Sequence, residues 1–113
     1  MTGHLGRIED LEPLARKARY SVSALAPLLG FGERQFERRF REDVGITPSK
    51  WIESVRMRLA GKLICRGTKT KEVASEVCFK DSSHFIRAFK RVMGLTPLAF
   101  FRQHLRDSRQ NVG

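Results

Sequence analysis

Two arginines, Arg38 and Arg87, occupy the middle of two similar segments, 36–40 and 85–89, each of which begins and ends with phenylalanine. A guanidinium group presents forked N–H donors that fit the edge of a guanine base or a phosphate group. Phenylalanines four residues apart share one side of a helix, so each arginine is expected on another side, facing outward. The alternative is an arginine that is only solvated, or that pairs with a carboxylate of its own chain.

The similarity extends beyond these two segments. Residues 36–48 return 49 residues later as residues 85–97, and six of the thirteen aligned positions are identical. Upstream the offset is 48, which pairs Phe31 with Phe79, so one residue has been gained before Phe85. The chain therefore holds two copies of one helical unit of roughly 25 residues.

The composition indicates a compact, basic protein. Of its 113 residues 41% are hydrophobic, and the formal net charge is +10. Such an excess favours an anionic partner, nucleic acid first and an acidic membrane surface second. No apolar run is long enough to span a bilayer and the first ten residues lack the apolar core of a signal peptide, so we expect a cytoplasmic protein.

Periodicity and turn signals predict an all-α fold of about seven helices. The expected helices are 8–18, a short one ending near Leu29 that Ser21 or Ser23 caps, 33–42, 48–65, 70–77, 82–92 and a last one from 97. The expected organisation is a flexible N-terminus (1–10), a first subdomain (11–47), a linker helix (48–66), a second subdomain (67–105) and a disordered tail (106–113).

Each repeat combines a short helix, a tight turn and a second helix with a narrow apolar stripe, which is typical of a helix-turn-helix. A helix that enters a major groove must be anchored through few residues, so that its other face stays free for bases and phosphates. Gly45 and Gly94 are expected to close these second helices in a left-handed conformation. Thr-Pro pairs at 47–48 and 96–97 then start the next helix.

Residues 79–91 read FKDSSHFIRAFKR and are followed by GLTP at 94–97. With this motif and its earlier copy, the chain resembles the DNA-binding domain of the AraC/XylS transcription regulators from about Leu11 to Leu105. The resemblance implies two helix-turn-helix subdomains joined by a linker helix, with one recognition helix in each of two successive major grooves of double-stranded DNA. Because the repeats differ in their exposed residues, we expect an asymmetric site.

The resemblance assigns contacts to both repeats. Base-contacting positions are Arg34, Glu37, Arg38, Ser82, Ser83, Ile86 and Arg87. Glu37 could accept from a cytosine amino group and Ile86 could meet a thymine methyl group. Phosphate-contacting positions are Ser23, Lys50, Thr70, Lys71, Lys90 and Arg91. The chain departs from the family pattern at Cys78, where glycine is usual, and positive φ there would strain the backbone.

Other functions receive less support. No phosphate-binding glycine loop and no hydrolase or metalloprotease motif is present, so we expect no enzyme, no metal and no cofactor. A module that binds a protein such as RNA polymerase, and a non-specific nucleoid-type binder, remain as alternatives. Since each chain carries two reading helices, the DNA-binding unit is expected to act as a monomer. At this length we expect no small-molecule effector, and the sequence leaves open whether a longer protein surrounds it.

Overall fold

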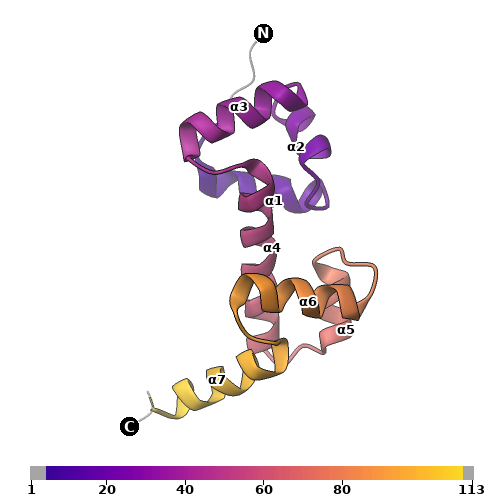
Figure 1. Ribbon diagram of the computed structural model, residues 1–113, viewed down its shortest axis with the longest axis vertical. Helices are drawn as coiled ribbons and strands as arrows, with labels where there is room; N and C mark the ends of the chain where they lie inside the picture. Colours follow the sequence, from indigo (N-terminus) through magenta and orange to yellow (C-terminus); the bar gives the residue numbers. More distant parts are fainter. Residues whose placement is uncertain (1–4, 111–113) are drawn as a thin grey trace. The chain divides into compact units, whose positions relative to one another are not determined.

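The computed structural model describes residues 5–110, and every regular element in that range is an α-helix (Figure 1). The helices are α1 (Ile8–Lys17), α2 (Val22–Leu28), α3 (Glu33–Val44), α4 (Pro48–Cys65), α5 (Thr70–Glu76), α6 (Ser82–Met93) and α7 (Pro97–Gln110). The predicted all-α fold with a long linker helix is confirmed. The chain divides into two compact units, and their boundary lies between Arg56 and Met57, inside α4.

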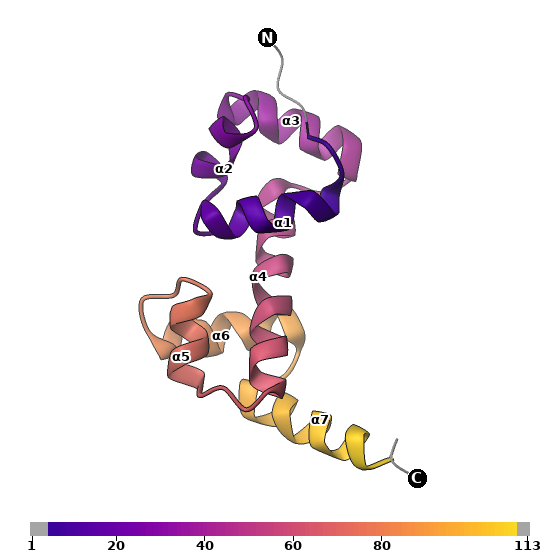
Figure 2. The same cartoon turned by 180° about the vertical axis from the view of Figure 1, so that it is seen from behind.

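Unit 1 comprises α1, α2, α3 and the first half of α4, and α2 lies between α1 and α3 at one side of the unit (Figures 1 and 2). Leu11 and Ala15 of α1 are buried, as are Leu25 and Ala26 of α2. Unit 2 holds the second half of α4 with α5, α6 and α7. Val73 and Ala74 of α5 are the buried counterparts of Leu25 and Ala26. Each unit therefore encloses its own apolar core.

The linker helix α4 contributes one half to each core. Helical spacing in the sequence predicts one apolar stripe along this helix, made of Trp51, Ile52, Val55, Leu59 and Leu63. In the first half Trp51, Ile52 and Val55 are buried as predicted, together with Pro48. The predicted stripe does not continue unchanged, because Leu59 and Leu63 are only half-buried. The buried positions of the second half are Met57, Ala60, Gly61 and Ile64. Extending one stripe along the helix missed them, since each half packs against the elements of its own unit.

Two ends of the chain are more ordered than predicted. The flexible segment 1–10 was wrong for residues 5–10, because Leu5 is buried and α1 begins at Ile8. Acidic Glu9 and Asp10 in the first turn favour this start through the helix dipole. The disordered tail 106–113 was wrong up to residue 110, because α7 continues to that point. A helix end made of polar residues can form from backbone hydrogen bonds alone, and the sequence has no glycine or proline between residue 98 and residue 112. Residues 1–4 and 111–113 lie outside the described range.

The short helix α2 begins at the earlier of the two possible caps. The Ser21 hydroxyl accepts a hydrogen bond from the Ala24 backbone N–H at 3.3 Å, whereas Ser23 lies inside the first turn. Pro27 lies past the first turn, where a proline removes a backbone hydrogen bond, yet the helix still begins at Val22. The helix ends one residue after it, at Leu28, so the missing proline N–H falls near the C-terminal end.

The tight turns that follow α2 and α5 have the same backbone conformation and the same hydrogen bond. Gly30 adopts φ 81° in the first turn and Cys78 adopts φ 64° in the second. The next residue then donates its N–H to an α2 or α5 carbonyl, Phe31 to Ala26 at 3.0 Å and Phe79 to Ala74 at 2.9 Å. The expected left-handed position is thus confirmed, and in unit 2 a residue with a Cβ occupies it.

The ends of α3 and α6 also match. Gly45 and Gly94 close these helices with φ 90° and 84°. After each glycine a threonine hydroxyl caps the next helix: Thr47 accepts from the Lys50 N–H and Thr96 from the Ala99 N–H, both at 3.2 Å. The repeated Gly-x-Thr-Pro sequence therefore encodes the same helix–turn–helix corner twice.

Candidate nucleic-acid interface

Helix α3 is anchored to unit 1 along a narrow aromatic stripe. Phe36 and Phe40 are fully buried, with 0% of their surface exposed. Their rings belong to a continuous series of contacts, with centroid distances of 5.9 Å from Phe31 to Phe36, 5.6 Å from Phe36 to Phe40 and 5.4 Å from Phe40 to Trp51. One side of α3 is therefore fixed, and the opposite side makes no comparable contact with the core.

Helix α6 is anchored in the same way in unit 2. The ring centroids lie 5.6 Å apart between Phe79 and Phe85, 5.7 Å between Phe85 and Phe89, and 5.3 Å between Phe89 and Phe100. Phe100 corresponds to Trp51 by the same offset of 49 residues. Thus the duplication seen in the sequence is also a duplication of the aromatic core that holds each second helix.

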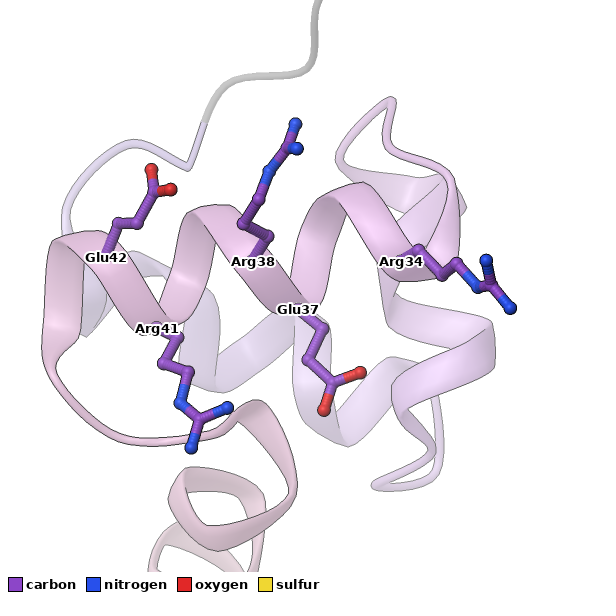
Figure 3. Close-up of a pocket in the computed structure, with 5 residues that line it drawn as sticks. All are labelled: Arg34, Glu37, Arg38, Arg41 and Glu42. Atoms are coloured by element: carbon purple, nitrogen blue, oxygen red, sulfur yellow. The ribbon is translucent and has the colours of Figure 1, made fainter.

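The outer side of α3 is a charged surface, which we call the α3 face: Arg34, Glu37, Arg38, Arg41 and Glu42. These side chains are exposed and line one open depression (Figure 3). At about 100° per residue, their positions span one side of the helix and lie opposite the two buried phenylalanines. Three predicted base-contacting residues, Arg34, Glu37 and Arg38, are therefore brought together on a free surface.

The corresponding α6 face consists of Ser83, Ile86, Arg87, Lys90 and Arg91, which occupy the equivalent positions 49 residues later. All are exposed except Ile86, which is half-buried. Ser82 is separated from the other predicted base contacts: it is the first residue of α6, half-buried, and its register points it toward the edge of the phenylalanine side. The other predicted residues of this helix share one side.

The side chains of Arg34, Arg38 and Arg87 form no hydrogen bond or ion pair with any described residue. The neighbouring Arg39 does: its Nε donates to Asp43 Oδ2 at 2.9 Å, and this bond raises the pKa of the guanidinium. Arg39 does not belong to the α3 face. The described residues therefore do not support the alternative that Arg38 or Arg87 mainly forms an ion pair within the chain.

The start of α6 is fixed by Asp81. Its carboxylate accepts a hydrogen bond from the His84 backbone N–H at 2.8 Å, and His84 Nδ1 lies 3.4 Å from the same group. The hydrogen bond from the His84 backbone lowers the pKa of Asp81, and the positive charge of Arg87 contributes. In unit 1 the equivalent cap is Gly32, which has no side chain to accept such a bond. The residue gained in the second turn thus accompanies a stronger cap.

The predicted phosphate contacts lie at helix starts or on the α6 face. Ser23 and Lys71 are exposed in the first turns of α2 and α5. Lys50 is exposed in the first turn of α4, where its N–H is held by Thr47. Thr70 is half-buried and is the first residue of α5.

Two residues of the α3 face, Arg41 and Glu42, are not among the predicted DNA contacts. Their counterparts in the second repeat, Lys90 and Arg91, were predicted contacts, so carrying the 49-residue offset back to α3 would have identified both positions. They also make the charge of the α3 face differ from that of the α6 face, because Glu42 occupies the position that Arg91 has in α6.

Two helix pairs, each with a tight turn and a second helix anchored through phenylalanine, define a tandem helix-turn-helix domain of the DNA-binding class. A family model described as a helix-turn-helix domain matches residues 14–103. The chain belongs to the AraC/XylS-type helix-turn-helix family of transcription regulators. Within residues 5–110, no helix is long and apolar enough to cross a membrane.

The chain is similar to transcriptional regulators of two bacteria. The chain is 31% identical over 81 residues to the probable transcriptional regulator LumQ of Photobacterium leiognathi, covering 71% of this chain and 33% of LumQ. It is 34% identical over 94 residues to the HTH-type transcriptional regulator YidL of Escherichia coli, covering 80% of this chain and 32% of YidL. The chain thus spans about a third of the length of these relatives.

Solved structures share the fold. The C-terminal domain of the response regulator yesN from Fusobacterium nucleatum matches with a TM-score of 0.71 and 23% identity, covering 82% of this chain and 96% of that domain. A DNA-binding transcriptional dual regulator from Escherichia coli matches with a TM-score of 0.73 and 21% identity, covering 85% of this chain and 89% of the other. At these identities the comparison establishes the architecture.

Proposed function

We propose that this protein is a sequence-specific double-stranded DNA-binding regulator of transcription that inserts α3 and α6 into successive major grooves of an asymmetric site. The observation that carries the proposal is the repeated geometry of these helices. Each is anchored by two fully buried phenylalanines, and each presents an exposed, arginine-bearing face on its opposite side. A free helical face with forked donors is what major-groove recognition requires.

The proposed contacts are of two kinds, with bases and with phosphates. Arg34, Glu37 and Arg38 read bases from α3, and Ser83, Ile86 and Arg87 read bases from α6, with Ser82 at the helix start. Phosphate contacts from Ser23, Lys50, Thr70, Lys71, Lys90 and Arg91 set the register of the protein on the duplex. Such contacts supply affinity without sequence information. The different side chains at equivalent positions support an asymmetric target.

One chain supplies both reading helices, so the DNA-binding unit acts as a monomer. We place it in the bacterial cytoplasm, where its DNA is found, and RNA polymerase is the natural second partner of a transcription regulator. The net charge of +10 also suits a non-specific binder, and preference for one sequence distinguishes the two functions. At physiological salt a specific binder prefers its site over random duplex by about a thousandfold or more.

Substitution of the two central arginines tests the proposal. Arg38→Ala or Arg87→Ala is expected to weaken binding to the preferred duplex by about 1 to 3 kcal/mol and to relax the preference at one base step. Fluorescence anisotropy with the preferred duplex and a set of single-base variants measures both effects. An equal loss on every duplex would make that arginine a phosphate contact, and no loss on any duplex would remove its helix from the interface.

A further inference from the structure

The α3 face and the α6 face differ in charge although they are built alike. The α3 face carries three arginines and two carboxylates, Glu37 and Glu42. The α6 face carries Arg87, Lys90 and Arg91 and no carboxylate. Asp81, the N-cap residue that precedes α6, is engaged at the helix start, where its carboxylate accepts the hydrogen bond from the His84 N–H.

The two carboxylates lie at the edges of the α3 face and not at its centre. By helical register the arginines of the α3 face form its central row, while Glu37 and Glu42 lie at its two edges. Figure 3 shows the two glutamate side chains on opposite sides of α3. In α6 the same edge positions hold Ile86 and Arg91, so one edge changes from negative to positive between the repeats.

A carboxylate at the edge of a helix in a major groove faces an unfavourable surrounding. The phosphates that flank the groove repel it, and its loss of hydration must be compensated by hydrogen-bond donors. The cytosine amino group in the major groove is the base donor that suits a glutamate. A duplex that lacks cytosine opposite the glutamate therefore leaves the carboxylate repelled and without a partner.

We infer that the two units contribute unequally to DNA binding: α6, beside its base contacts, supplies most of the sequence-independent attraction, and α3 supplies the sharper discrimination through Glu37 and Glu42. Glu37 selects a cytosine by accepting from its amino group. Glu42 lowers the affinity of α3 for any duplex that offers no hydrogen-bond donor to its carboxylate, and so penalises poorly matched sequences. The inference rests on the proposed function, because it assumes that both faces meet DNA.

Charge removal without change of shape tests this unequal contribution. The double variant Glu37→Gln/Glu42→Gln keeps the side-chain size and removes two negative charges from the α3 face. A matched control, Asp10→Asn/Asp107→Asn, changes the net charge by the same amount at exposed positions of α1 and α7. Circular dichroism of all variants verifies that the helices are retained.

Affinities for a preferred duplex, obtained by selection from random sequence, and for a random duplex are measured between about 50 and 200 mM salt. The glutamine variant is expected to bind random duplex more tightly and to lose about tenfold in the ratio of preferred to random affinity, the scale of one discriminated base pair. The control should strengthen binding to both duplexes alike and leave the ratio unchanged. Lys90→Gln should weaken both alike and reduce the salt slope by about one unit.

The possible results distinguish a failure of this inference from a failure of the proposed function. If the unsubstituted protein prefers its site but the glutamine variant keeps the same ratio, the inferred unequal contribution is wrong and the proposed function stands. A Lys90→Gln variant that changes the ratio would likewise overturn the role given to α6. If the unsubstituted protein binds all duplexes alike, the proposed function fails and the inference fails with it.

Discussion

The left-handed residue in each tight turn leads to a prediction that can be tested by exchanging glycine and alanine at two equivalent positions. Gly30 and Cys78 have φ values of 81° and 64°. A side chain with a Cβ in this conformation costs about 1 to 2 kcal/mol. Glycine avoids this cost, but its larger loss of backbone entropy on folding costs about 0.5 to 1 kcal/mol relative to alanine. The net preference for glycine over alanine should be about 1 kcal/mol at each position.

The comparison of Cys78→Gly with Cys78→Ala isolates this backbone effect, since both variants lose the thiol and whatever it contacts. The glycine variant should be more stable by about 1 kcal/mol, which corresponds to about 4 °C in Tm for a chain of this size. Gly30→Ala should be destabilised relative to the unsubstituted protein by the same amount. Urea unfolding followed by circular dichroism measures all of these differences.

Ser75 provides the matched control, because it is exposed and lies inside α5, three residues before Cys78. In a helix interior the preference reverses, so Ser75→Ala should be more stable than Ser75→Gly by about 1 kcal/mol. Equal stability of the glycine and alanine variants at position 78, or an advantage for alanine there, would refute the reasoning from φ.

Three further predictions concern a phosphate contact, a helix cap and a close approach of two helices. Lys50→Ala should weaken binding to all duplexes alike and reduce the salt slope by about one unit, and a change in sequence preference would contradict its assignment as a phosphate contact. Because the pKa of Asp81 is lowered from 3.8 in the folded state, its stabilising effect should be present above that pH and be lost as the pH falls through the folded-state pKa. Asp81→Asn should therefore lie closest to the unsubstituted protein in unfolding free energy in acid, and a difference that is constant from neutral to acid pH would exclude this linkage. A Cβ on Gly61 would lie 3.3 Å from Phe100 Cζ, so Gly61→Leu should destabilise the protein by about 1 to 3 kcal/mol in urea unfolding, with partial recovery on adding Phe100→Ala.

Much of the fold followed from local rules that need no knowledge of packing. Glycine at 45 and 94 and the Thr-Pro pairs behind them specify helix ends and starts through φ and side-chain caps. The closing glycines and the starts at 48 and 97 were predicted correctly, whereas α3 and α6 end at Val44 and Met93 and not at 42 and 92. The paired phenylalanines of α3 and α6 follow helical periodicity and are buried as predicted. Cys78 stands where the family usually has glycine and was noted as a position that positive φ would strain; its φ is indeed positive, at 64°.

Of the features that were missed, the buried side of α4 depends on tertiary context. The buried side of the second half of α4, with Met57 and Ile64, is chosen by what unit 2 packs against that helix. The polar end of α7 gave no apolar signal, yet it is helical to residue 110. Arg41 and Glu42 looked like ordinary surface charges until the structure placed them on one face with Arg38.

A selection from random duplex with the purified protein tests the central claim most directly, because it reports specificity, site length and the spacing of the contacted segments together. Two reading helices in successive major grooves predict one asymmetric site with two contacted segments about one helical turn apart, roughly 34 Å along the duplex. Recovery of a site confined to a single groove segment, or of no enriched sequence, would contradict the claim that both α3 and α6 read DNA.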